Sequence, residues 1–189
     1  MSPDDQLHQI PPDLPVPVDD GACNHLPGHP VPAMSLQATT GGRINLSQVT
    51  GRVIVYCYPR TGTPGQPPSP EWDAIPGARG CTPEACAFRD HHEELQRRGV
   101  TVFGLSTQSA DAQREFARRE HLPFPLLSDA DLEFVRALRL TTFEFGGMTL
   151  VKRLTLVIDG GRITHVFYPV FPPQDHPEEV LAWLDAQSE

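Results

Sequence analysis

The sequence predicts an α/β protein in which helices cover both faces of a central mixed β-sheet. Runs of β-branched and aromatic residues alternate along the chain with segments of helical periodicity. The last two apolar runs are separated by an Asp-Gly-Gly turn, which predicts an antiparallel hairpin added to an otherwise parallel sheet. At 189 residues the chain is long enough for one domain with a substantial core.

Proline content divides the chain into regular and irregular parts. Of 21 prolines, eight lie within residues 1–32, seven between Pro59 and Pro83, and four between Pro169 and Pro177. We therefore expect residues 1–22 to form an extended, proline-rich arm and residues 23–189 to form a single domain.

The first half of the domain begins with weak strands and continues with strong elements. Short strands are expected at 34–38 and 43–46, around a Thr-Gly-Gly turn. Residues 52–58 (RVIVYCY) are continuously apolar, as is typical of a central strand covered on both faces. After a loop over residues 60–80, Thr82 is expected to cap a helix with Pro83 in its first turn, and this helix should end at Arg97-Arg98-Gly99.

The second half repeats the alternation. A strand is expected at 100–106, then a helix from Ser109 with Ala112 and Phe116 facing inward. The remaining expected elements are a short strand at 126–128, a helix at 129–139, a hairpin of strands 153–158 and 162–168, and a final helix at 177–186. This order fits a thioredoxin-like fold, a central sheet with helices on both sides.

Charge and hydropathy exclude several classes of protein. The chain carries 15 Lys and Arg against 24 Asp and Glu, a formal charge of −9. Such acidity argues against nucleic acid or an anionic membrane as a partner. The longest clean apolar run is six residues, whereas a membrane-spanning helix needs about 20. The N-terminus has no basic head or apolar stretch, so we expect a cytoplasmic protein whose four cysteines are reduced at rest.

Cys81 is the first candidate for chemistry. It directly precedes the expected helix cap, so it should face unpaired backbone N–H groups and the positive end of the helix dipole. Both stabilise a thiolate, the nucleophilic form of cysteine. The alternative is a small buried apolar residue, as most free cysteines are.

Cys86 lies five residues later in the same expected helix. Five residues advance a helix by about 7.5 Å and turn it by roughly 500°, whereas a disulfide needs Cα atoms about 4.4–6.8 Å apart. The two cysteines can bond only if the first turns of the helix unwind, so Cys86 is either a resolving thiol or a packed core residue. Cys57 is expected to be inert in its strand, and Cys23 lies near the arm.

No metal or cofactor site is expected. The eight histidines are scattered, Cys-x4-Cys is not a usual zinc spacing, and no second cysteine pair exists. The chain also lacks a phosphate-binding loop and a Gly-x-Gly-x-x-Gly motif.

Three segments together resemble the peroxiredoxins, most closely the bacterioferritin-comigratory or PrxQ-like subgroup. Residues 58–65 (YPRTGTPG) and 80–90 (GCTPEACAFRD) are similar to the active-site stretch of that family. Residues 153–159 (RLTLVID) are similar to a later segment in which an arginine opens a strand. The resemblance covers roughly residues 24–186.

The resemblance implies a role for six residues. Cys81 would attack the peroxide O–O bond and become a sulfenic acid. Arg153 would hold the thiolate and the peroxide oxygens, and Glu84 would orient an arginine. Thr63 would hydrogen-bond the thiolate or the peroxide, and Pro59 would shield the sulfur from water. Cys86 would condense with the sulfenic acid, and a thioredoxin- or glutaredoxin-like reductant would reopen the Cys81–Cys86 disulfide.

One departure from the family pattern concerns residues 66–80. Ala78 stands where the family has a threonine, three residues before the cysteine, and Ala74 stands where it has a proline. Pro59 and Thr63 match those positions if 15 residues are inserted between them and Cys81. The insert is either a surface loop or a flap that places Trp72 and Ile75 over a peroxide channel.

The sequence therefore predicts a thiol peroxidase that reduces hydrogen peroxide and organic hydroperoxides. A thiol–disulfide oxidoreductase or peroxide sensor on the same fold is the alternative, although such proteins usually carry Cys-x-x-Cys. A copper metallochaperone is a third possibility, and its usual Cys-x-x-x-Cys is missing. The resemblance favours a monomer, with a weak homodimer as the alternative.

Overall fold

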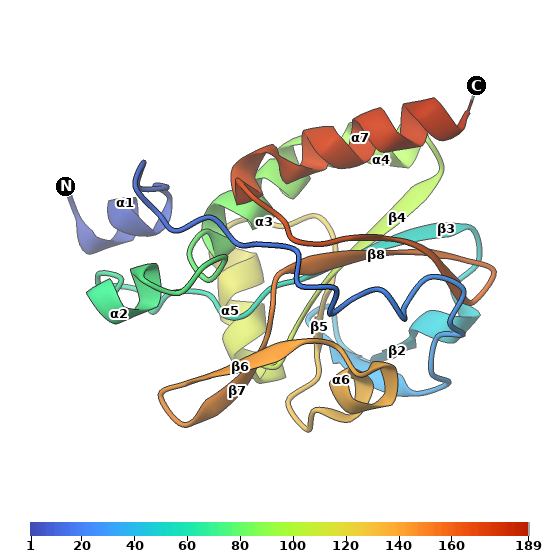
Figure 1. Cartoon of the computed structure of the whole chain (residues 1–189), viewed down its shortest axis with the longest axis horizontal. Coiled ribbons are helices and arrows are strands. Elements are labelled where there is room, and N and C mark those ends of the chain that lie inside the picture. The colour runs from blue at the N-terminus through green and yellow to red at the C-terminus, as the bar shows by residue number, and fades with distance from the viewer. Residues whose placement is uncertain (189) are drawn as a thin grey trace.

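A computed structural model, described here for residues 1–188, has one seven-stranded mixed sheet in the order β2-β1-β5-β4-β3-β8-β9. Strands β3, β4 and β5 run parallel, and β8, β9, β1 and β2 extend the sheet antiparallel at its two sides (Figure 1). The strands are β1 (Ser35–Ala38), β2 (Arg43–Asn45), β3 (Arg52–Cys57), β4 (Val100–Ser106), β5 (Leu126–Ser128), β6 (Thr142–Phe145), β7 (Met148–Val151), β8 (Leu154–Asp159) and β9 (Arg162–Phe167).

The helices lie on both faces of this sheet, which confirms the predicted thioredoxin-like α/β fold. Helices α3, α4, α5 and α7 cover one face, and α6 with the chain around residues 23–31 covers the other. The helices are α1 (Pro3–Leu7), α2 (Pro70–Asp73), α3 (Cys81–Asp90), α4 (His92–Arg97), α5 (Ala110–Arg119), α6 (Glu133–Leu138) and α7 (His176–Gln187), with 3-10 turns η1 (Leu46–Gln48) and η2 (Pro173–Asp175).

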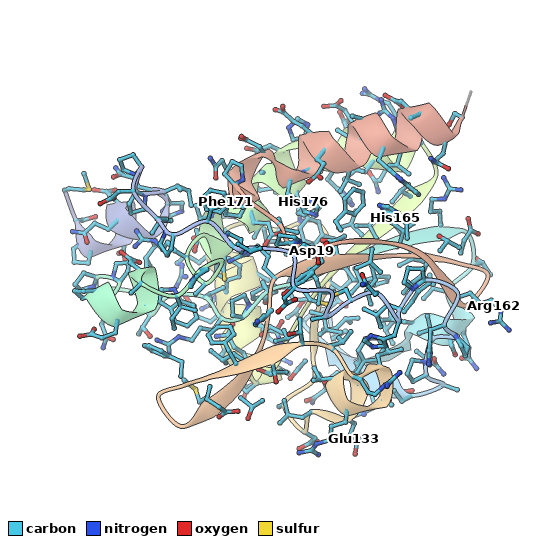
Figure 2. All side chains as sticks on the ribbon, in the orientation of Figure 1. Asp19, Glu133, Arg162, His165, Phe171 and His176 are labelled. Atoms are coloured by element: carbon cyan, nitrogen blue, oxygen red, sulfur yellow. The ribbon has the colours of Figure 1, made fainter. Side chains whose placement is uncertain are left out.

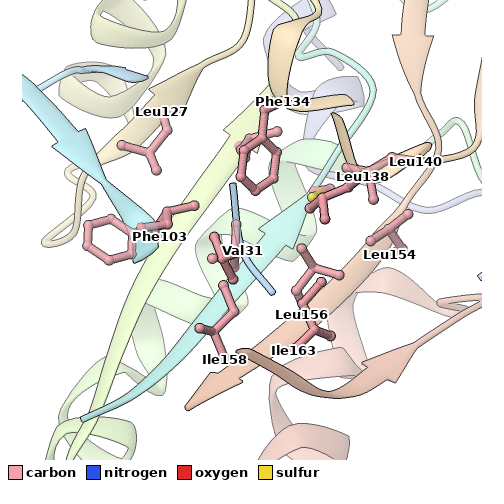
Figure 3. Packing of buried hydrophobic residues seen from close by; sticks show 14 of the residues in the cluster. Val31, Phe103, Leu127, Phe134, Leu138, Leu140, Leu154, Leu156, Ile158 and Ile163 are labelled. Carbon is pink, nitrogen blue, oxygen red and sulfur yellow. The ribbon is translucent and has the colours of Figure 1, made fainter. Parts of the chain in front are cut away.

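The continuous apolar run of β3 is explained by its central position. Val53, Val55 and Cys57 face the core under α6, and Ile54 and Tyr56 face the core under α3 and α7. Successive side chains of a strand point to opposite faces, so a strand covered on both sides must be apolar at every position. Figure 3 shows the first of these cores, where residues of α6, β4, β5, β8 and β9 pack together.

The helix that carries both candidate cysteines begins two residues earlier than predicted. Gly80 is its N-cap, in the left-handed region at φ 113°, and Cys81 is the first helical residue. The prediction that Thr82 caps the helix is therefore wrong, because glycine reaches this conformation without steric cost. The expected single helix is also divided at His91 into α3 and α4.

Two buried polar residues account for further differences. In α5 the inward residue is Gln113 rather than Ala112, which is exposed. The side chain of Gln113 accepts a hydrogen bond from Tyr58 Oη at 2.8 Å. Asp129 lies outside α6, and its carboxylate accepts from the backbone N–H groups of Phe134 and Val135 at 3.0 and 2.8 Å. Sequence periodicity registers apolar faces and does not reveal such bonds.

Two segments expected to be irregular contain structure. The arm begins with α1, capped by Ser2, and the loop over residues 60–80 contains α2, capped by Ser69. A second sheet of β6 and β7, which the sequence analysis did not predict, packs Phe143 and Phe145 against Trp72. Figure 1 shows α1 and α2 side by side at the end of the molecule where α3 begins. Among residues 1–188 no helix is long and apolar enough to cross a membrane.

Candidate active site

Cys81 lines a pocket of about 170 Å³ where α3 begins. Gly80, which permits the sharp entry into the helix, lies against Pro173 and Ile10, and a Cβ at this position would come within 2.3 Å of the proline ring. The close approach of these segments leaves Cys81 buried, with only 5% of the residue exposed to solvent. The pocket wall is shared by the arm, the segment after β3, the insert and α3: Leu7, Arg60, Thr63, Trp72, Arg79 and Thr82.

Arg153, at the start of β8, brings its guanidinium to the sulfur. Its Nη2 lies 3.2 Å from Cys81 Sγ, and its Nη1 donates to the carboxylate of Glu84 one turn into α3. The ion pair is almost completely buried, with side-chain exposures of 1% for Arg153 and 0% for Glu84. The backbone carbonyls of Gly77 and Ala78 accept from the same guanidinium at 3.2 and 3.0 Å. The arginine therefore cannot turn away from the sulfur without breaking several buried hydrogen bonds.

Opposing effects set the pKa of Cys81. Burial raises the pKa of the thiol, and the nearby Glu84 carboxylate adds to this increase. The charge and hydrogen bond of Arg153 lower the pKa, as does the backbone N–H of Arg60. The start of a helix provides further stabilisation of a thiolate. In this buried position the thiolate depends on Arg153.

His176 of α7 is a second group that acts on the Glu84 carboxyl. His176, labelled in Figure 2, is the first residue of α7 and packs edge-on against Phe88 and Phe167. Its Nε2 lies 2.8 Å from Thr155 Oγ1, and its charge lowers the pKa of the Glu84 carboxyl, which burial raises. Within residues 1–188 Glu84 Oε1 is buried without a hydrogen-bond partner, so Arg153 and His176 are the groups that favour its ionised form.

The predicted residues Pro59 and Thr63 lie differently with respect to the sulfur. Pro59 is buried directly after β3. Thr63 lines the pocket with an exposed side chain, and no hydrogen bond joins its hydroxyl to Cys81 in the described part of the chain. The neighbouring Thr61 is buried instead, and Gln108 Oε1 accepts from its backbone N–H at 3.0 Å.

The insert contributes directly to the pocket. Trp72 lines it and is buried against Phe145, with the Arg60 guanidinium 4.9 Å from its ring centroid. Ile75 does not reach this pocket and lines a second hollow beside the arm. The carbonyls that hold Arg153 also belong to the insert. The insert is therefore both a wall of the pocket and part of the support of the arginine.

Cys86 points away from Cys81 in the intact helix. Its sulfur lies 3.5 Å from Glu120 Oε2 at the end of α5 and is half-buried. Burial and the Glu120 charge raise the pKa of this thiol to about 12. All four cysteines are free thiols. Cys57 is completely buried in β3 and Cys23 is buried beneath the sheet, where burial raises the pKa of both thiols.

The contribution of the arm was not foreseen from the sequence. Arg79, immediately before the glycine cap, binds Asp73 through both carboxylate oxygens and donates to the carbonyls of Gln6 and Gln9 at 2.6 and 3.1 Å. Leu7 packs so closely on Gly62 that a Cβ there would come within 2.3 Å of it. The sequence signal is a basic residue two positions before the cysteine, which does not identify its partners.

Comparison with known proteins places these features in a family. The Redoxin family matches residues 26–182. The chain is 36% identical over 162 residues to peroxiredoxin Bcp of Escherichia coli, covering 83% of this chain and 94% of that protein. It is 34% identical over 161 residues to the chloroplastic peroxiredoxin Q of Sedum lineare, covering 84% and 77%.

Solved structures give the same result. The crystal structure of peroxidoxin BcpB from Mycobacterium tuberculosis has a TM-score of 0.69 at 30% identity, covering 86% of this chain and 98% of that one. The bacterioferritin comigratory protein of Xanthomonas campestris has a TM-score of 0.66 at 21% identity, covering 94% and 100%. The latter likeness concerns the fold alone.

Proposed function

This chain belongs to the peroxiredoxins of the Bcp and Q type and is a thiol-dependent peroxidase, and we propose that Cys81, Arg153, Glu84 and Cys86 carry its reaction. The observation that supports this assignment is the 3.2 Å contact between Arg153 Nη2 and the Sγ of Cys81, which lines a pocket. The arginine is itself held by Glu84 and by carbonyls of the insert.

In the first step the Cys81 thiolate attacks one oxygen of the peroxide. An S–O bond forms, the O–O bond breaks, and the leaving oxygen takes a proton to become water or an alcohol. The developing negative charge on that oxygen lies near the Arg153 guanidinium, which donates through more than one N–H group. Pro59 would exclude water from the sulfur, and Thr63, on the pocket wall, would bind the entering peroxide.

In the second step the Cys86 thiolate attacks the sulfur of the Cys81 sulfenic acid. An S–S bond forms and the hydroxyl group leaves as water after taking a proton. Because the two residues are five positions apart in α3 and face different sides, the first turns of the helix must unwind. The break between α3 and α4 at His91 limits how far this unwinding extends.

A dithiol reductant completes the cycle by thiol–disulfide exchange. We assign this role to a thioredoxin- or glutaredoxin-like protein, and the substrates to hydrogen peroxide and organic hydroperoxides. The pocket wall is partly apolar through Leu7 and Trp72, which suits an alkyl group on the peroxide. We further propose a cytoplasmic monomer or weak homodimer, since reduced cysteines and enzymatic recycling require a reducing compartment.

The proposal is tested by mixing fully reduced protein with one equivalent of hydrogen peroxide. Free thiols are then trapped and the peptides mapped by mass spectrometry at increasing times. Rapid loss of two thiols with a Cys81–Cys86 link is the expected result. Cys86→Ser should stop at the sulfenic acid of Cys81, whereas the matched Cys57→Ser should still form the link.

Different outcomes would contradict different parts of the assignment. A sulfenic acid on Cys81 with Cys86 free in the wild-type chain would remove the resolving role of Cys86. A first oxidation at another cysteine would contradict the assignment of Cys81. Oxidation of the wild-type chain by small disulfides at the same rate as by peroxide would favour a disulfide oxidoreductase.

A further inference from the structure

Three potential metal ligands from distant parts of the sequence meet beside the resolving cysteine. His8 follows α1, Cys86 lies in α3, and Glu120 follows α5. His8 Nε2 is 2.9 Å and Cys86 Sγ is 3.5 Å from Glu120 Oε2, and the three ligand atoms all lie within 4.8 Å of one another. The first and last of these residues are 112 positions apart, so local sequence spacing does not reveal the cluster.

The spacing and chemistry of these atoms fit a tetrahedral zinc-type ion. Metal–ligand bonds of about 2.0–2.3 Å give ligand separations of roughly 3.3–3.8 Å. The distances of 2.9 and 3.5 Å to Glu120 Oε2 are close to this range, and the pair of His8 Nε2 and Cys86 Sγ, within 4.8 Å, would close by rotation of the exposed His8 side chain. An imidazole nitrogen, a thiolate and a carboxylate oxygen are all zinc ligands. The histidine side chain is 47% exposed, so water can reach a fourth position.

The surroundings orient two of the ligands. The Nδ1 of His8 lies 3.0 Å from the carbonyl of Asp4, so that Nδ1–H can donate while Nε2 faces the cluster. A metal-binding histidine usually donates its other N–H in this manner. The second oxygen of Glu120 accepts from Arg119 Nε at 3.3 Å, which leaves Oε2 directed at His8 and Cys86.

Charge balance also permits a divalent cation. Without metal, an imidazolium, a neutral thiol and a carboxylate sum to zero. With metal, a neutral imidazole, a thiolate, a carboxylate and the divalent ion also sum to zero, and two protons are released. Arg119 and Arg89 both donate hydrogen bonds to Glu120. The net charge of the cluster beside these two arginines is therefore the same in the metal-free and metal-bound states.

We propose that His8, Cys86 and Glu120 bind a zinc-type divalent ion in the reduced protein, with water as the fourth ligand. The sequence predicts no metal site, because only the fold brings these three ligands together. The ion would tie the arm to α3 and occupy the thiol of Cys86. Its effect on turnover rests on the proposed function: formation of the Cys81–Cys86 disulfide requires release of the ion.

Binding is measured in a Cys81→Ser background, where no peroxide chemistry occurs and Cys81 cannot act as a ligand. The reduced, chelator-treated protein is titrated with Zn²⁺ against a chromogenic chelator, and with Co²⁺ to detect thiolate-to-metal charge transfer. One ion per chain is expected. Adding His8→Gln, Glu120→Gln or Cys86→Ser should weaken binding at least about tenfold, and Cys86→Ser should abolish the charge-transfer band. The matched His29→Gln should change neither.

The outcomes separate this proposal from the proposed function. Absence of stoichiometric binding, or binding that survives Cys86→Ser with its charge-transfer band, would overturn the metal site whatever the peroxidase activity is. If metal binds as expected, Zn²⁺ should slow disulfide formation in the wild-type chain while the sulfenic acid of Cys81 still forms. Circular dichroism of each variant checks that loss of metal binding is not caused by loss of the fold. Of the three ligand variants, His8→Gln disturbs the hydrophobic core least, because its side chain lies on the exposed arm.

Discussion

Replacement of Arg153 separates its structural and chemical contributions. In Arg153→Met the Glu84 carboxylate loses its buried partner, while the methionine fills much of the same volume. Breaking one side of a buried ion pair costs about 3–5 kcal/mol, against a total stability of roughly 5–15 kcal/mol for a domain. At about 2–4 °C per kcal/mol for a chain of this size, the melting temperature should fall by roughly 6–20 °C.

The double variant Arg153→Met/Glu84→Gln should recover much of this loss, because no buried charge then remains unpaired. Reactivity should not recover. The thiolate loses a charge-assisted hydrogen bond at 3.2 Å, which is worth about 1.5–3 kcal/mol and corresponds to roughly a 10–150-fold slower reaction with peroxide. The pKa of Cys81 rises in both variants, because Arg153 is the largest influence that lowers it.

The assay combines thermal unfolding with single-turnover oxidation by hydrogen peroxide across a pH series. Both Arg153 variants should react faster as pH rises, with their profiles displaced to higher pH than the wild type. Arg52→Met is the control, since its pair with Asp159 is largely exposed and worth at most about 1 kcal/mol. Equal melting temperatures for the single and double variants, or a peroxide rate within about threefold of wild type, would refute the reasoning.

Three further predictions concern the surroundings of the two cysteines. Gly80→Ala should destabilise the protein by backbone strain of about 1–3 kcal/mol plus overpacking of about 1–3 kcal/mol against Pro173, whereas the control Gly160→Ala, at φ 56° with open space around it, should cost only about 1–2 kcal/mol. The urea midpoints of the two variants test this, and equal losses of stability would contradict the close approach of Pro173 to Gly80. Glu120→Gln in metal-free Cys81→Ser protein should lower the pKa of Cys86 and speed its alkylation roughly tenfold, and an unchanged rate would exclude the influence of the carboxylate. Docking of residues 1–10 on the domain should be strongest between about pH 4.5 and 6.5. Because the pKa of His8 is raised, its contribution to stability is lost as the pH rises through that pKa. Because the pKa of Glu120 is lowered, its contribution is lost as the pH falls through that pKa. Hydrogen exchange of the arm should follow this window in wild type and not in His8→Gln.

The sheet could be predicted because each of its strong strands carries a local pattern. The segment at 52–58 is apolar at every position because both faces of β3 are covered, and the Asp-Gly-Gly turn marks the β8–β9 hairpin. The β6–β7 hairpin was missed although the Gly146-Gly147 turn between its strands is a local signal. Its aromatic residues pack on Trp72 of the insert rather than on the main core. Its stability depends on a contact between segments that the sequence does not connect.

The active site, like the sheet, could be predicted from local sequence only in part. That Cys81 lies at the N-terminus of a helix follows from the residues beside it. It is the first helical residue, however, and the cap is a left-handed glycine rather than the expected threonine. The roles of Arg153 and Glu84 were inferred only through resemblance, since an arginine at the start of a strand is usually an exposed charge. Their contact joins residues 69 positions apart, and periodicity contains no information about such a pair.

The composition of the arm is a misleading guide to its structure. Proline and acidic residues reduce the capacity to form a core, and residues 1–22 carry both. Their order comes instead from a few specific contacts: Leu7 against Gly62, two carbonyls on Arg79, and His8 on Glu120. Each contact reaches either the pocket of Cys81 or the thiol of Cys86. The arm therefore holds the segment that would have to unwind for the proposed Cys81–Cys86 disulfide. Removal of the arm should speed the formation of that disulfide more than it changes the first reaction with peroxide.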